Sequence, residues 1–151
     1  MIRQEYMIRL AVAADVARIG AIVAVAYGGY VTRMGGQLPG PMRDDYAALV
    51  EAGQVWLAGD PAMGVLVLRD QPDHLLLDNI AVDPAAQGSG VGRALLQFAD
   101  AAARQRGYAE LRLYTHETMV ENIALYKRLG WQETGRATQA GLHRVFFRKP
   151  A

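Results

Sequence analysis

The most informative segment of this sequence runs from residue 80 to residue 94. It reads Ile80-Ala81-Val82-Asp83-Pro84, two alanines, and then Gln87-Gly88-Ser89-Gly90-Val91-Gly92-Arg93-Ala94. An apolar run typical of a buried strand is followed by alternating glycines and an amphipathic helical pattern. Glycine allows positive φ and a close approach of the backbone to a ligand, and the free N–H groups at a helix start bind anions. The segment therefore predicts a strand, a turn and a helix, with either a pyrophosphate site or a plain tight connection at the turn.

Two other phosphate-binding loops fit this segment poorly. A Walker loop needs Gly-Lys followed by Ser or Thr, and that tripeptide does not occur in the sequence. The dinucleotide fingerprint G-x-G-x-x-G needs a glycine at position 93, where Arg93 stands, and it usually follows the first strand of the fold. A nucleotide- or dinucleotide-binding enzyme is therefore disfavoured.

Hydrophobic periodicity on both sides of this segment predicts one α/β domain with the order β-α-α-β-β-β-α-β-α-β-β. Strands are predicted over residues 6–10, 54–58, 64–69, 75–82, 110–115, 131–136 and 143–148. Helices are predicted to begin at residues 15, 44, 91 and 121, and Gly107 and Gly130 end the last two. Short connections between the strands before residue 82 favour antiparallel pairing. The Gly/Pro-rich residues 28–41 predict a mobile loop.

Composition and charge exclude several classes of protein. The 151 residues contain 16 Lys and Arg against 15 Asp and Glu, a balance that argues against nucleic-acid binding. Because the chain has no cysteine, disulfides and a thiolate nucleophile are excluded, and because its three histidines lack ligand spacing, we expect no metal. No apolar run approaches the roughly 20 residues of a membrane span, and no secretory pattern is seen, so we expect a cytoplasmic protein without membrane contact. Residues 1–151 are expected to form one domain, with residues 1–6 as a dispensable extension.

The glycine-rich segment resembles the acetyl-CoA loop of the GNAT superfamily of N-acetyltransferases, whose pattern is Q/R-x-x-G-x-G/A. Gln87, Gly90 and Gly92 stand at its fixed positions, and the usual strand ending in Val-Asp-Pro precedes them. The later stretch Asn122-Ile-Ala-Leu-Tyr126-Lys-Arg-Leu-Gly-Trp is similar to the family's helix with Tyr before a Leu-Gly-aromatic end. The resemblance implies a single-domain GNAT-like α/β fold. Its mixed, mostly antiparallel sheet would have splayed central strands at residues 75–82 and 110–115, with helices on both faces.

The resemblance also implies acetyl-CoA as the co-substrate. Backbone groups of Ile80, Ala81 and Val82 would bind pantetheine and polarise the thioester carbonyl. The pyrophosphate would lie against Gln87, Gly88, Ser89, Gly90, Val91, Gly92 and Arg93, although the Arg93 side chain can equally be a solvated residue of the first helical turn. The family commonly has Asn seven residues before the Tyr, where this sequence has Met119. Asn122 is therefore expected either to contact the CoA arm or to cap the helix start.

Tyr126 resembles the general acid of the family, which protonates the departing CoA thiolate; the alternative is that it only packs on the apolar face of its helix. The general base that deprotonates the acceptor amine stays open among Asp78, His116, Glu117, His143 and water. Strand alternation places Asp78 on the face of Ile80 and Val82, and His116 on the face of Tyr114.

Acceptor specificity is expected from the first inter-helix loop, where Tyr27, Tyr30 and Arg33 lie, although Tyr27 is alternatively a core residue. Arg33 is a candidate to attract an acceptor carboxylate. The resemblance thus implies acetyl transfer from acetyl-CoA to a primary amine of a small molecule, peptide or protein by direct attack in a ternary complex. A homodimer is compatible with such a fold. The competing hypothesis is a non-catalytic CoA-binding regulatory module.

Overall fold

The computed structural model describes residues 7–151, so the dispensable extension expected at residues 1–6 lies outside the described residues. One seven-stranded sheet has the strand order β1-β2-β3-β4-β5-β7-β6. The strands are β1 (Ile8–Leu10), β2 (Val55–Ala58), β3 (Gly64–Asp70), β4 (Leu75–Val82), β5 (Glu110–His116), β6 (Gln132–Gln139) and β7 (Leu142–Pro150). The α-helices are α1 (Val16–Tyr27), α2 (Tyr30–Arg33), α3 (Tyr46–Glu51), α4 (Val91–Gln105) and α5 (Val120–Arg128).

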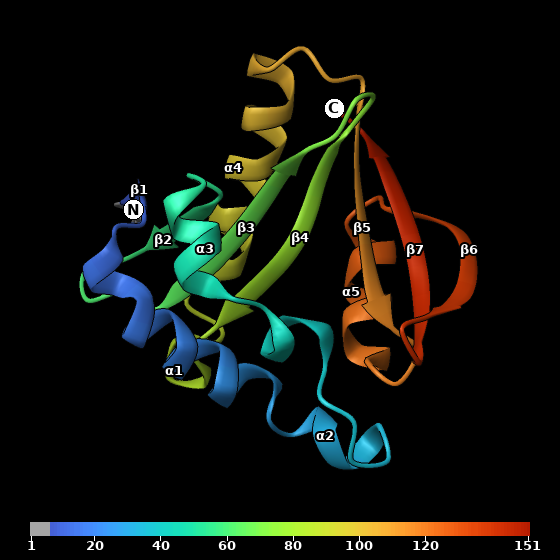
Figure 1. Ribbon diagram of the computed structural model, residues 1–151. Helices are drawn as coiled ribbons and strands as arrows, with labels where there is room; N and C mark the ends of the chain where they lie inside the picture. The colour runs from blue at the N-terminus through green and yellow to red at the C-terminus, as the bar shows by residue number, and fades with distance from the viewer. Residues whose placement is uncertain (1–6) are drawn as a thin grey trace.

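The two central strands of the sheet diverge. Neighbouring strands are antiparallel except β4 and β5, which are parallel and pair only where residues 75–77 meet residues 111–113. Beyond Leu77 the strands separate, as Figure 1 shows where the green β4 and the orange β5 move apart. The predicted mixed, mostly antiparallel sheet with splayed central strands is therefore confirmed. Among the described residues, β4 beyond Leu77 has no strand partner on the β5 side.

Helices cover both faces of the sheet, as the sequence predicts. On one face α4 packs on β2, β3 and β4 through fully buried side chains such as Leu95 and Ala99. On the other face α1 and α3 cover the same strands with Ile19, Ile22 and Leu49 (Figure 1). Gly64 of β3 permits the close approach of α4, because a Cβ there would lie 2.6 Å from Val91 Cγ1.

The segment expected to be a mobile loop is partly helical. Residues 28–41 contain α2, and a 3₁₀ turn follows at Gly40–Arg43. The side chain of Met34 is buried in the core under α1, which ties the segment to the domain. The expectation of an irregular connection is therefore wrong for Tyr30–Arg33, because Gly28 and Gly29 both adopt right-handed helical φ and ψ and do not break the chain's helical path.

A β-bulge in β4 corrects the predicted alternation. Val67 of β3 pairs with Asn79 and Leu68 pairs with Leu77, so Asp78 is an extra residue in β4. Asp78 therefore lies on the face of α1, whereas Ile80 and Val82 pack against the core under α4. The prediction that these three residues share one face is wrong, because a bulge shifts side-chain alternation by one residue.

An ion pair at the start of the domain predicts a pH dependence of stability. The guanidinium of Arg9 donates two 2.8 Å hydrogen bonds to the Asp15 carboxylate, and the Val12 backbone N–H donates a third at 2.8 Å. Together these hydrogen bonds lower the pKa of Asp15 to about 2. A depressed pKa stabilises the fold above the ordinary carboxyl pKa, and the contribution is lost as pH falls through the folded value. Since the pair is partly exposed, Asp15→Asn should lower the free energy of unfolding by about 0.5–1 kcal/mol at pH 7. In urea titrations that difference should shrink between pH 4 and pH 2; an unchanged difference would contradict the assignment.

Candidate active site

Two cavities meet where β4 and β5 diverge. The larger, which we call the outer cavity, has a volume of about 680 Å³ and lies between the end of β4, the start of α4 and helix α5. It is lined by all eleven residues predicted to bind the cofactor, which are Ile80, Ala81, Val82, Gln87, Gly88, Ser89, Gly90, Val91, Gly92, Arg93 and Asn122. The smaller, the inner cavity, has a volume of about 50 Å³ and lies between β4, β5, β7 and the α2–α3 connection. Tyr27, Ile80, Asn122 and Tyr126 line both cavities.

The glycine-rich turn is shaped by two left-handed residues. Gly88 has φ +80° and Gly90 has φ +94°, a region that side chains other than glycine rarely adopt. Gly90 caps α4, so the N–H groups of the first helical turn open into the outer cavity. Asp83 fixes the approach to this turn, because its carboxylate accepts a 3.0 Å bond from the Ala85 N–H and pairs with Arg18 at 3.1 Å. The local geometry fits an anion at the start of α4.

Asn122 lies at the junction of the two cavities. Helix α5 begins at Val120 with Met119 as its N-cap residue, and no side chain caps it. The alternative that Asn122 caps the helix start is therefore wrong. Its amide nitrogen approaches the sulfur of Met119 at 3.8 Å, and its side chain borders both cavities.

Tyr126 of α5 separates the two cavities. Its ring packs edge-on to Trp131 and tilted to Phe147, with centroids 6.0 and 5.9 Å away, so the residue also belongs to the core. Within the described residues no hydrogen bond is found for its hydroxyl. Burial raises the pKa of Tyr126 well above its ordinary value, and the phenol is therefore protonated at neutral pH. A buried, protonated hydroxyl between two cavities can donate a proton to a group bound there.

The bulged part of β4 is held by a buried polar network. Tyr27 lies in the core, and its hydroxyl contacts Asn79 Oδ1 at 2.8 Å and the Ile80 carbonyl at 2.7 Å. The Asn79 amide donates to the Tyr46 hydroxyl at 2.8 Å, and that hydroxyl donates to the Pro41 carbonyl at 2.5 Å. The network joins α1, α3 and the α2–α3 connection to β4. Tyr27 is therefore a core residue, which was one of the two alternatives that the sequence left open. It also borders both cavities.

Asp78 is the carboxylate of the inner cavity. The Tyr114 hydroxyl donates a 2.6 Å bond to Asp78 Oδ1, and Arg69 Nε lies 3.0 Å from Oδ2. The second contact is an ion pair only, because the Arg69 N–H does not point along a hydrogen bond. Burial and the bond to Asp78 raise the pKa of Tyr114. Both carboxylate oxygens thus have a partner and keep further lone pairs for a ligand.

His116 ends β5 and presents a hydrogen-bond donor to the inner cavity. The Thr118 backbone N–H donates to its Nδ1 at 3.2 Å, and the Thr118 hydroxyl, which can also donate, lies 2.9 Å from the same nitrogen. A backbone N–H can only donate, so Nδ1 accepts and the proton of the neutral ring lies on Nε2. Burial lowers the pKa of His116, which favours this neutral form. In this form Nε2 carries the hydrogen, and the nitrogen with the lone pair is the one that Thr118 contacts.

The remaining sequence-predicted residues lie around this site. Arg33 pairs with Glu121 at 2.7 Å and lines neither cavity. Tyr30 borders the outer cavity, with its hydroxyl 3.5 Å from Glu121. Glu117 and His143 lie outside both cavities, and the His143 ring packs edge-on to His116.

Four polar residues of the site were missed by the sequence analysis, namely Arg69, Asn79, Tyr114 and Arg144. Tyr114 and Arg144 share a sheet face with His116, so alternation along residues 110–116 and 142–150 was a usable signal for them. Asn79 follows Asp78, and the bulge that brings both to one face has no signature in the sequence. In residues 7–151 no three His, Asp or Glu side chains form a group that could hold a metal ion, and no helix is long and apolar enough to cross a bilayer.

Comparison with solved structures identifies the fold. The paia N-acetyltransferase of Thermoplasma acidophilum, solved with coenzyme A, superposes with a TM-score of 0.76 over 98% of this chain and 100% of that chain, at 15% identity. The putative acetyltransferase yncA of Salmonella typhimurium, solved with its cofactor acetyl-CoA, gives 0.70 over 97% and 94%, at 24% identity. Likeness at these identities concerns the fold.

The matches to curated protein sequences cover only part of this chain and part of each relative. The [ribosomal protein bS18]-alanine N-acetyltransferase of Escherichia coli (strain K12) is 44% identical over 61 residues, which are 40% of this chain and 41% of that protein. N-alpha-acetyltransferase 80 of Mus musculus is 38% identical over 63 residues, which are 42% of this chain and 19% of that protein. The chain thus matches less than half the length of these relatives. The profile described as acetyltransferase (GNAT) domain matches residues 51–133, more than half of the chain. By this match the chain belongs to the GNAT acetyltransferase domain family.

Proposed function

We propose that this chain transfers an acetyl group from acetyl-CoA to a primary amine of a small molecule or protein, by direct attack in a ternary complex. The observation that carries the proposal is the junction of the two cavities at Tyr126, beside the open edge of β4. Solved relatives of this fold hold coenzyme A or acetyl-CoA, and curated relatives are named as N-acetyltransferases.

Acetyl-CoA would occupy the outer cavity. Its pyrophosphate would receive hydrogen bonds from the N–H groups of Gly88, Gly90 and the first turn of α4, where the helix dipole also favours negative charge. The pantetheine arm would extend along residues 78–82 of β4, for which residues 7–151 supply no strand partner on the β5 side. An N–H of that edge would stabilise the charge that develops on the thioester oxygen.

The acceptor would enter through the inner cavity. Its amine nitrogen attacks the thioester carbonyl carbon, the new C–N bond forms and the C–S bond breaks. We assign the proton lost by the amine to Asp78 or to water bound beside it. Tyr126 would donate a proton to the departing thiolate, so the products are an acetylated amine and CoA. No covalent acyl-enzyme is required.

Thermal unfolding with and without acetyl-CoA tests the cofactor assignment. A ligand at about 100 times its Kd should raise the free energy of unfolding by about 2.7 kcal/mol, which raises the melting temperature by several degrees. NAD and ATP should cause no comparable shift. If acetyl-CoA stabilises the protein, thiol release with a panel of amines then measures turnover. Binding without turnover of any amine would favour the non-catalytic regulatory module, and the absence of a shift would remove the proposal.

A further inference from the structure

One wall of the inner cavity carries a hydrogen-bond donor without a partner. His116 is only 7% exposed, and its Nε2 has no hydrogen-bond partner in the described part of the chain. Since Nδ1 accepts from the Thr118 N–H, the group left over is an N–H donor. A buried donor without a partner is destabilising unless a ligand completes it.

Arg144 supplies a positive charge beside His116. The two residues are direct cross-strand partners of β5 and β7, so their side chains lie next to each other on one sheet face. The Arg144 guanidinium stacks on the Tyr114 ring, with Cζ 4.3 Å from the centroid, and Nη1 donates to Gln139 Oε1 at 2.8 Å. These contacts orient the guanidinium without neutralising its charge.

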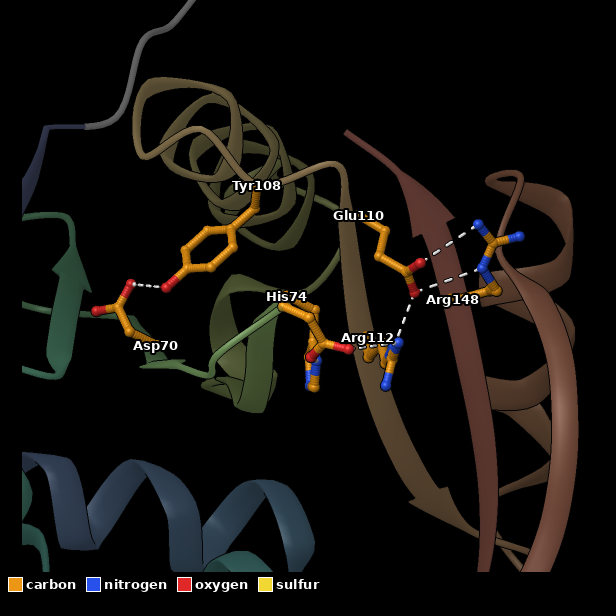
Figure 2. Close-up of polar contacts among 7 residues, drawn as sticks. Asp70, His74, Tyr108, Glu110, Arg112 and Arg148 are labelled. Atoms are coloured by element: carbon orange, nitrogen blue, oxygen red, sulfur yellow. Dashed lines mark hydrogen bonds and ion pairs between the residues drawn. The ribbon is translucent and has the colours of Figure 1, made fainter.

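The other arginines of this face have carboxylate partners. Arg112 and Arg148 both pair with Glu110, at 2.8 and 3.4 Å, and Figure 2 shows this carboxylate between the two guanidinium groups. In residues 7–151 no ion pair is found for Arg144. The carboxyl group of Asp44, whose pKa is raised by burial, interacts with Arg144 only through space. Arg144 is therefore the arginine of this face that is available to an anion.

The wall of the cavity that β4 supplies is negative. Asp78 borders the same cavity as His116 and Arg144, and each of its oxygens keeps a lone pair. An acceptor with an ammonium group and a carboxylate a few bonds apart matches both walls. The volume of about 50 Å³ suits the small head group of such a molecule.

We propose that Arg144 and the Nε2–H of His116 bind the carboxylate of the acceptor, so that the substrate is an amino acid acetylated on its amine. The inference rests on the proposed function and narrows its acceptor class. Arg144 would give two parallel N–H bonds to the carboxylate, and His116 a third. Asp78 would hold the amine, which places the nitrogen near the thioester at Tyr126. His116 and Arg144 are thus specificity-determining residues.

Matched acceptors test this inference by thiol release. The panel contains the free α-amino acids, β-alanine and 4-aminobutyrate, together with the amides and decarboxylated amines of the same compounds, and a short peptide series with free N-termini. We expect kcat/KM for at least one free amino acid to exceed that of its amide and of its decarboxylated amine by roughly 10- to 100-fold, the range for a charge-assisted hydrogen bond. The peptides distinguish a free amino acid from the N-terminus of a longer chain, and preferred use of peptides would overturn the inference.

Variants separate specificity from general damage. Arg144→Gln should lower kcat/KM for the free amino acid by the same factor, mainly through KM, and should leave the amide unchanged. Arg144→Lys should recover only part of the loss, because an ammonium cannot form the two parallel bonds. His116→Ala should act in the same direction more weakly. The matched control is Arg136→Gln, which removes one positive charge from the exposed strand β6, where Arg136 pairs with Glu133. Melting curves verify that each variant is folded.

Failure of this inference is distinguishable from failure of the proposed function. If acetyl-CoA raises the melting temperature but amides and simple amines react as well as amino acids, the carboxylate subsite is wrong and the acetyltransferase assignment stands. Equal losses for both acceptor types in Arg144→Gln would also overturn the subsite alone, as would acetyl-CoA binding with no use of any carboxylate-bearing amine. If acetyl-CoA does not bind, both proposals fail.

Discussion

Gly92→Glu should remove acetyl-CoA binding and leave the fold intact. Gly92 is the second residue of α4 and borders the outer cavity. A Cβ there would meet only Val82 Cγ2, at 3.6 Å, which is an ordinary contact. A carboxylate in the first turn of a helix is favourable for the helix itself. The same carboxylate would occupy the proposed pyrophosphate position and repel it, so we expect the Kd for acetyl-CoA to rise at least 100-fold.

Isothermal calorimetry with acetyl-CoA measures the loss, and Gly92→Ala is the matched control. Alanine adds the same Cβ without charge, so its Kd should stay within a few-fold of the parent value. The melting temperature of Gly92→Glu without ligand should match that of the parent, since the substitution touches no buried partner. Tight binding of acetyl-CoA by Gly92→Glu would show that the pyrophosphate lies elsewhere. Weak binding by Gly92→Ala as well would instead indicate a steric effect.

The order of the elements could be predicted from the sequence because it depends on local patterns. Apolar alternation, helical stripes and the stops at Gly107 and Gly130 are properties of neighbouring residues, and the structure reproduces them. The residues expected to bind the cofactor, apart from Asn122, border one cavity for a similar reason, since residues 80–93 are contiguous from the end of β4 to the start of α4. Two features of the fold differ from the prediction: α2, where Gly28 and Gly29 have helical backbone geometry, and the face of Asp78, which the bulge in β4 shifts.

The inner cavity could not be predicted because it is assembled from distant strands. Asp78 and Tyr114 are 36 residues apart, and their 2.6 Å contact depends on the bulge in β4. His116 and Arg144 become neighbours only through the register of β5 against β7. Arg33 was expected to attract a carboxylate because of its place on the loop, but Glu121 neutralises it.

Tyr126→Phe should slow turnover and leave acetyl-CoA affinity unchanged. The hydroxyl has no protein partner within the described residues, so its removal breaks no hydrogen bond there, and the ring keeps its contacts with Trp131 and Phe147. General-acid catalysis typically contributes about 10²- to 10⁴-fold, so we expect kcat to fall by roughly that factor. Because the raised pKa keeps the phenol protonated, the loss should be similar across neutral and mildly alkaline pH.

Two comparisons distinguish proton donation by Tyr126 from packing. Tyr108→Phe removes a hydroxyl that contacts Asp70 at 3.0 Å and lines neither cavity, and kcat in this control should stay close to that of the parent. An acetyl thioester with a less basic leaving thiol needs less proton donation, so Tyr126→Phe should lose less activity with it than with acetyl-CoA. A purely structural role would reduce turnover of both thioesters equally and would lower the melting temperature. Equal kcat in Tyr126→Phe and the parent would refute the assignment, and the departing thiolate would then take its proton from water at the cavity junction.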